Sequence, residues 1–193
     1  MGNSRKQVPK LNLFCHTLLV NFGIYQRKKG KIPNVKKVDK KVKEFLSERW
    51  EATRGPEKNS WVIEYEEIAI HLRIREIDRF TDEWDHIVVI EFSSAILFDV
   101  ECTNELYEHI ARTNGDSLFG AIFATASSLS EEEGYCDLIM NHRMMGNSLT
   151  KDELNLSIVA LGIVMKEFRK EYFDLFGGTP VTDLGDIFGD ENE

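Results

Sequence analysis

The feature that most constrains the fold is a long helix near the C-terminus with a clear start and stop. Thr150-Lys-Asp-Glu153 is a capping box, in which two side chains satisfy backbone N–H groups at the start of a helix. Gly177-Gly178, followed by Pro180, predicts the end of the helix at Phe176. Its apolar residues form a broad stripe, which predicts that the helix packs against the core: Leu154, Ile158, Leu161, Met165, Phe168, Tyr172 and Phe176.

An alternating pattern earlier in the chain predicts strands. Ile68, Ile70, Leu72 and Ile74 alternate with more polar residues, as in a strand with one buried face. A similar alternation begins at Trp61, so residues 61–75 are predicted as one long bent strand or two short ones.

Three further strands follow from local composition. Residues 86–92 are predicted as a strand after a charged loop over 76–85. Residues 118–126 are almost entirely apolar, which predicts a central strand covered on both faces. Residues 135–145 are predicted as the last strand, with Cys136, Leu138, Met140 and Met144 on one face.

Two more helices complete the order of elements. Residues 35–50 carry apolar side chains at helical spacing, with lysines over the remaining surface. Thr103 is expected to cap a helix that runs to Thr113, with Gly115 as a left-handed stop. The order is α-β-β-β-α-β-β-α, which predicts an α+β sandwich with a five-stranded, mainly antiparallel sheet and helices packed on it.

The charge distribution suggests how the chain is organised. Residues 1–60 carry 15 basic and five acidic residues, whereas the remaining 133 carry nine and 28. We therefore expect an N-terminal extension with a basic linker over 1–33, a folded domain over 34–178 and an acidic tail over 179–193. The basic stretch 5–43 is open to two interpretations: a solvated surface, or a nucleic-acid or anionic-surface site with Lys36, Lys37, Lys40 and Lys41 as contacts.

The cysteines and the N-terminus bear on the compartment. Cys15, Cys102 and Cys136 are an odd, widely spaced set, which favours free thiols and a reducing, cytoplasmic location. The uncharged run 11–26 contains Asn12, His16, Asn21 and Gln26 and is shorter than the ~20 apolar residues of a spanning helix, so no membrane span is expected.

Catalytic and metal-binding patterns are weak. Gly115-Asp-Ser117-Leu118 matches the signature of GDSL-type serine hydrolases, but no Asp-x-x-His follows Ser117, and the nearest later histidine is His142 in a predicted strand. The histidines do not occur at a helical i, i+4 spacing; a metal could be held only across the sheet, by His71 and His142. We predict no catalytic residue, no metal and no cofactor.

Three segments together resemble the YbjN-like branch of the type III secretion chaperone-like superfamily: NELYEHIARTN (104–114), SLFGAIFAT (117–125) and YCDLIMNHRMMGNSLTKDELNLSIVALGIVMKEF (135–168). The resemblance covers roughly residues 35–178. It implies the α-β-β-β-α-β-β-α domain, a bacterial protein without enzymatic activity, and a chaperone-like or regulatory role.

The resemblance and the physics of strand edges give a functional expectation. We expect a non-enzymatic factor that binds a protein or peptide, with a homodimer as a further option and nucleic acid as the competing partner. An exposed sheet edge or apolar face can hold an extended segment. The predicted peptide contacts are Tyr135, Ile139 and Met145, on the outer face of the last strand.

Overall fold

The computed structural model describes residues 34–181, apart from 82–83, 118 and 131. The predicted extension over 1–33 and most of the predicted acidic tail lie outside the described residues. The elements in chain order are α2 (Val35–Ser47), β1 (Ala52–Arg54), β2 (Ser60–Tyr65), β3 (Ile68–Thr81), β4 (Trp84–Glu101), α3 (Asn104–Asp116), β5 (Ala121–Ala126), β6 (Tyr135–Met145), a single 3-10 turn (Gly146–Ser148), α4 (Lys151–Phe176) and β7 (Thr179–Pro180).

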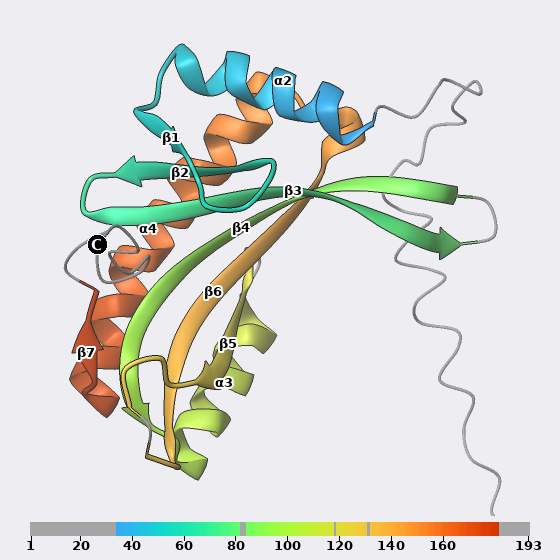
Figure 1. Ribbon diagram of the computed structural model, residues 1–193. Helices are drawn as coiled ribbons and strands as arrows, with labels where there is room; N and C mark the ends of the chain where they lie inside the picture. The colour runs from blue at the N-terminus through green and yellow to red at the C-terminus, as the bar shows by residue number, and fades with distance from the viewer. Residues whose placement is uncertain (1–33, 82–83, 118, 131, 182–193) are drawn as a thin grey trace, which may run out of the picture. The chain divides into compact units, whose positions relative to one another are not determined.

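The fold is α+β, with α2, α3 and α4 on one face of an antiparallel sheet (Figure 1). The predicted count of five strands is wrong. The sheet runs β1-β2-β3-β4-β6-β5, and β7 pairs with β4. The additional strands, β1 and β7, have three and two residues, too few to produce a readable alternation.

The predicted loop over 76–85 is also wrong, because β3 and β4 form one long hairpin that extends beyond the rest of the sheet (Figure 1). Their pairing continues from Ile74 opposite Ile90 to Ile77 opposite Ile87. The pairing continues to Asp78 opposite His86, so the backbone groups of these residues are satisfied across the two strands whatever the polarity of their side chains. Charged residues therefore did not indicate a loop here.

The helix ends follow the sequence in α4 and at the start of α3, whereas α2 ends at Ser47 and not at the predicted residue 50. Thr150 and Glu153 form the complete capping box of α4, and Gly177, with a φ of 69°, ends that helix. Thr103 accepts from the Leu106 N–H at the start of α3. The predicted stop at Gly115 is wrong, because α3 continues through Asp116 and Gly115 does not have a positive φ.

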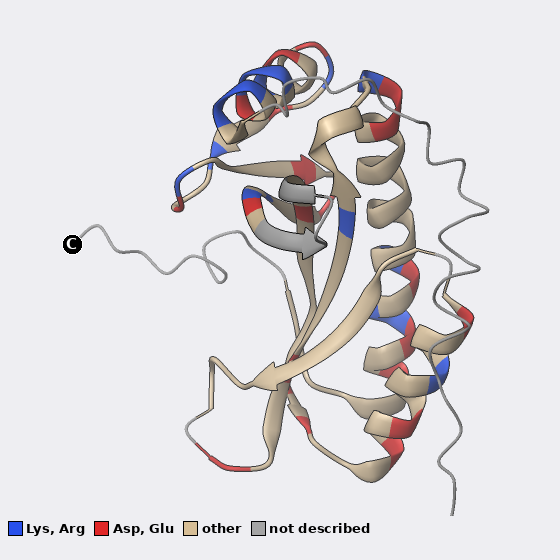
Figure 2. Cartoon of the chain, turned by 90° about the vertical axis from the view of Figure 1, so that its right-hand side faces the viewer, with Lys and Arg blue, Asp and Glu red and all other residues tan. Residues whose placement is uncertain are grey.

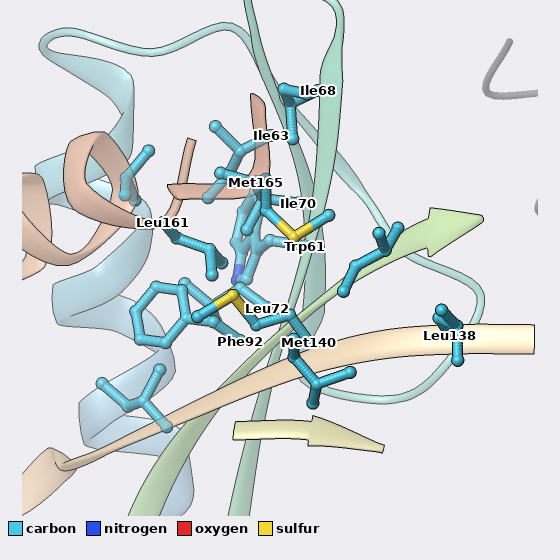
Figure 3. Packing of buried hydrophobic residues seen from close by; sticks show 14 of the residues in the cluster. Trp61, Ile63, Ile68, Ile70, Leu72, Phe92, Leu138, Met140, Leu161 and Met165 are labelled. Atoms are coloured by element: carbon cyan, nitrogen blue, oxygen red, sulfur yellow. The ribbon is translucent and has the colours of Figure 1, made fainter. Parts of the chain in front are cut away.

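The core lies between the helices and the helix-facing side of the sheet, which we name the inner face; the opposite side is the outer face. Figure 3 shows Ile70, Leu72 and Phe92 of the sheet packed toward Leu161 and Met165 of α4. The apolar stripe of α4 therefore lies where its spacing predicts.

The sheet divides where β4 separates from β3. The last β3–β4 pair toward this end is His71 with Ser93, after which β4 continues with β6 on one side and β7 on the other. Extra β4 residues shift its register with β6 between Ala95 and Leu97, and again before Val100. Such bulges leave backbone groups without a ladder partner.

The side chain of Arg169, on α4, lies where β3 and β4 separate. Its guanidinium donates to the Ala95 carbonyl at 2.9 Å, to the Glu67 carbonyl at 3.2 Å and to the Val181 carbonyl at 3.5 Å. Burial lowers the pKa of Arg169, but an arginine remains charged at neutral pH. One side chain thus connects the β2–β3 turn, β4 and the chain after β7.

A pair of glycine substitutions tests the packing of α4. A Cβ at Gly162 would lie 2.2 Å from a ring carbon of Tyr65, whereas a Cβ at Gly115 meets nothing within 4 Å. We expect Gly162→Ala to lower the free energy of unfolding by about 1–3 kcal/mol through overpacking. Gly115→Ala, the matched control, should raise it by up to about 1 kcal/mol through helix propensity. Urea unfolding measures both, and a stabilised Gly162→Ala would contradict the packing described.

Candidate functional site

β5 is the last strand of the sheet, and one of its edges has no neighbouring strand among the described residues. It pairs with β6 along its whole length. The Ser127 N–H donates to the Tyr135 carbonyl at 3.2 Å, which fixes the phase of the ladder. Odd-numbered residues of β5 therefore bond to β6, and the even-numbered ones direct their N–H and C=O groups outward.

Asn114 of α3 closes the first part of this edge. Its Oδ1 accepts from the Ile122 N–H at 2.7 Å, and its Nδ2 donates to the Ile122 carbonyl at 2.9 Å. The amide thus makes the two bonds that a neighbouring strand would make. The outward backbone groups of Ala124 and Ala126 come next, with no partner within the described part of the chain.

The turn after β5 ends the open edge at its C-terminal end. Asp137 accepts from the Ser128 N–H at 2.8 Å and from the Asp99 N–H at 3.1 Å. Ser127 Oγ donates to Asp99 Oδ1 at 3.1 Å. These bonds turn the chain away from the edge after Ala126, so the open part of β5 is short.

Large apolar side chains lie exposed around this open part. Phe123 of β5 is 48% exposed, Leu129 of the β5–β6 loop 55% and Tyr135 of β6 37%. An apolar group at a strand edge is the usual setting for an added strand, since main-chain bonds and side-chain contacts are then available together. We name Phe123–Ala126, Leu129 and Tyr135 the β5 edge site.

The three predicted peptide contacts all lie on the outer face of β6, but not together. Ile139 is directly opposite Phe123, and Tyr135 lies at the start of the strand. Met145 is ten residues from Tyr135, about 33 Å along an extended strand. Tyr135 and Ile139 therefore lie near the β5 edge site, and Met145 lies at the other end of β6.

Sequence reasoning missed Phe123, Ala124 and Ala126, because it interpreted 118–126 as a central strand. That prediction is wrong: β5 is an edge strand, and only Ile122 of its six residues is buried. The apolar character comes from small alanines and from Ile122, whose side chain packs in the core.

The outer face has an apolar part and a basic part. Ala95, Phe98 and Val181 form a buried cluster, and Ala95 lies opposite Ile139. Farther along the same face are Arg73, Arg75 and Arg143, which we name the arginine group.

Two carboxylates lie among these arginines. Arg75 and Arg143 both contact Glu91 Oε1, at 2.6 Å and 2.7 Å. Arg73 pairs with Glu57 at 2.8 Å. The arginine group therefore keeps one positive charge beyond its two carboxylate partners.

A second surface feature is a hollow of about 300 Å³ beside Arg169, between α4 and the β2–β3 turn. Ile68, Leu97 and Phe173 supply apolar lining. Lys166 at its rim pairs with Glu66 at 2.6 Å. Acidic and basic side chains are mixed around it, so it does not favour one charge of ligand.

The predicted anion contacts lie on α2, which shows a cluster of basic positions in Figure 2. Lys36, Lys37 and Lys40 are exposed. Lys40 lies 3.8 Å from Glu44, and the ammonium of Lys41 donates to the Leu149 carbonyl. The side chains of Lys36, Lys37 and Lys40 are therefore accessible to an anion, and that of Lys41 is engaged.

Gly115 and Asp116 of the GDSL-like motif form the end of α3, and Ser117 follows as its C-cap. Ser117 Oγ donates to the Phe119 carbonyl at 2.9 Å and accepts from the Phe119 N–H. His142 stacks on the Phe119 ring at 3.8 Å, and burial lowers its pKa. His71 is opposite Ser93 and His142 opposite Phe92, so the two histidines lie on opposite faces of the sheet. No cluster of metal-binding side chains occurs among the described residues.

Comparison with known proteins identifies the fold. No protein-family model matches the chain, and no curated protein matches it. Among solved structures, the crystal structure of YbjN from E. coli, a candidate transcription regulator, matches with a TM-score of 0.53 and 11% sequence identity. The match covers 78% of this chain and 99% of YbjN. The chain therefore has the YbjN-like fold, as the resemblance predicted.

Within the described ranges, no helix is long and apolar enough to cross a membrane.

Asn114→Ala tests the closure of the β5 edge. The substitution leaves the Ile122 backbone groups without their partners, so we expect the free energy of unfolding to fall by about 1–3 kcal/mol in urea. The longer open edge should also increase self-association in sedimentation velocity. Asn104→Ala, at the exposed start of the same helix, is the control and should change neither measurement. If Asn114→Ala also changed neither, Asn114 would not be the cap of this edge.

Proposed function

We propose that this protein is a non-enzymatic binding factor that holds an extended segment of a partner protein at the β5 edge site. One observation carries the proposal. The backbone N–H and C=O groups of Ala124 and Ala126 point away from β6, beside the exposed side chains of Phe123 and Tyr135. A partner strand would add to the sheet next to β5, and Asn114 would set its limit at Ile122.

The short edge defines what the partner has to supply. Two outward residues offer at most four main-chain hydrogen bonds, each contributing about 0.5–1.5 kcal/mol net. That is too little for a stable complex once the cost of ordering a peptide is met. The partner segment therefore needs bulky apolar side chains on one face, to cover Phe123 and Leu129.

The YbjN-like fold supports a binding or regulatory role. YbjN is itself described as a candidate regulator of transcription. The resemblance to secretion chaperone-like proteins implies an extended polypeptide partner, which is the kind of ligand that an open strand edge fits.

Anion binding on α2 is the second candidate function. The exposed Lys36, Lys37 and Lys40 favour it, and their contacts with phosphates would weaken steeply with salt. The two functions use different elements, so one set of variants separates them.

Ala124→Pro is the direct test of the edge. Its N–H faces outward, so proline blocks an added strand without removing a bond to β6. Peptides selected from a random library on the wild-type chain should bind Ala124→Pro at least tenfold more weakly in fluorescence anisotropy. Lys36→Glu with Lys37→Glu is the control and should leave peptide binding unchanged.

Urea unfolding checks that both variants remain folded. Equal peptide affinity for wild type and Ala124→Pro would refute the edge site. Binding of a nonspecific DNA duplex at low salt that weakens steeply toward 0.3 M salt and is lost in the lysine variant would instead favour α2.

A further inference from the structure

The described helices leave the outer face of the sheet uncovered, since α2, α3 and α4 all pack on the inner face (Figures 1 and 2). Val181, which follows β7, packs there against Ala95 and Phe98. The chain thus begins to cover this face just before residues 182–193.

The direction of the chain at this point is set by β7. Pro180 lies opposite Leu97 and Thr179 opposite Phe98, so the chain runs antiparallel to β4. Continuing in that direction leads from Ala95 toward Glu91, where the arginine group lies. The distance from Ala95 to Glu91 along β4 is about 13 Å, and twelve residues can span up to about 40 Å.

The sequence of 182–193, TDLGDIFGDENE, matches the two parts of the outer face. Its apolar residues, Leu184, Ile187 and Phe188, come first. It carries five acidic residues and no basic one, and three of the acidic residues lie among its last four. The face offers an apolar part next to Val181, formed by Ala95, Ile139 and Phe123, and then the arginine group.

We propose that residues 182–193 are the intramolecular occupant of the outer face, with Leu184, Ile187 and Phe188 on the apolar part and the acidic end at the arginine group. Continuity from Val181, the direction of β7, sufficient length and complementary charge all favour this occupant. Because Phe123 belongs to both surfaces, a partner at the β5 edge would compete with residues 182–193 for it. This competition rests on the proposed function, whereas the contact of residues 182–193 with the outer face does not.

Site-specific photo-cross-linking in the full chain tests the proposal. Benzoylphenylalanine replaces Phe123, and the irradiated protein is digested and mapped by mass spectrometry. Phe173 of α4, with an exposure of 45% close to the 48% of Phe123, is the matched control position beside the hollow near Arg169. We expect the position-123 probe to form its main intramolecular adduct with residues 182–193, at a yield independent of protein concentration, and the position-173 probe to form none with them.

Two variants probe the two halves of the contact. Replacing both Ile187 and Phe188 by serine should reduce the adduct several-fold, and so should Arg143→Gln, with folding checked by urea. An adduct with 182–193 from position 173 alone, an adduct only between two chains, or no adduct from position 123 would overturn the proposal. The measurement needs no partner, so its failure is distinct from a failure of peptides to bind the β5 edge.

Discussion

The contact between Arg169 and the carbonyls of β4 and the β2–β3 turn holds the two halves of the sheet together. β4 is 18 residues long and pairs with β3 over only part of that length. Beyond Ser93 its backbone needs other partners, and Arg169 donates to Ala95 and Glu67 where the strands separate. Ser94 Oγ bridges the same division by donating to the Ala69 carbonyl at 2.7 Å. A half-buried arginine is favourable here because it donates to three carbonyl groups.

The division determines which edges the sheet exposes. Beyond the point where β4 separates from β3, the sheet consists of β7, β4, β6 and β5, with β5 at its edge. Exposed edges invite unwanted pairing, and proteins usually shorten or cover them. Here the Asn114 amide covers Ile122, and the turn held by Asp137 ends the strand. The two residues left between them, Ala124 and Ala126, are too few to form a stable sheet with another chain through main-chain hydrogen bonds alone.

Much of the fold could be predicted because the relevant signals are local. The capping box at Thr150, the cap at Thr103 and the alternation from Ile68 to Ile74 each depend on a few neighbouring residues. The wrong predictions concern features that depend on residues distant in the sequence. Whether an apolar segment such as 121–126 lies at the centre or the edge of a sheet depends on strand order, and strand order is not encoded in that segment.

The candidate site was predictable only in part for the same reason. Tyr135 and Ile139 could be placed on the outer face of the last strand from alternation alone. Their relation to Phe123 needs the β5–β6 register, and the closure by Asn114 needs the packing of α3 against β5. The predicted loop over 76–85 is the converse error, since charge indicated a loop where the pairing of β3 with β4 continues to Asp78 opposite His86.

Amide hydrogen exchange of β5 in the isolated chain tests the central claim most directly. The account predicts slow exchange at Phe123 and Thr125, which bond to β6, and at Ile122, which bonds to Asn114. Ala124 and Ala126 should exchange much faster than these neighbours, because their N–H groups face outward without a partner. Exchange at Ala124 and Ala126 as slow as at Phe123 and Thr125 would show that the edge is already covered, and would contradict its proposed role as the binding surface.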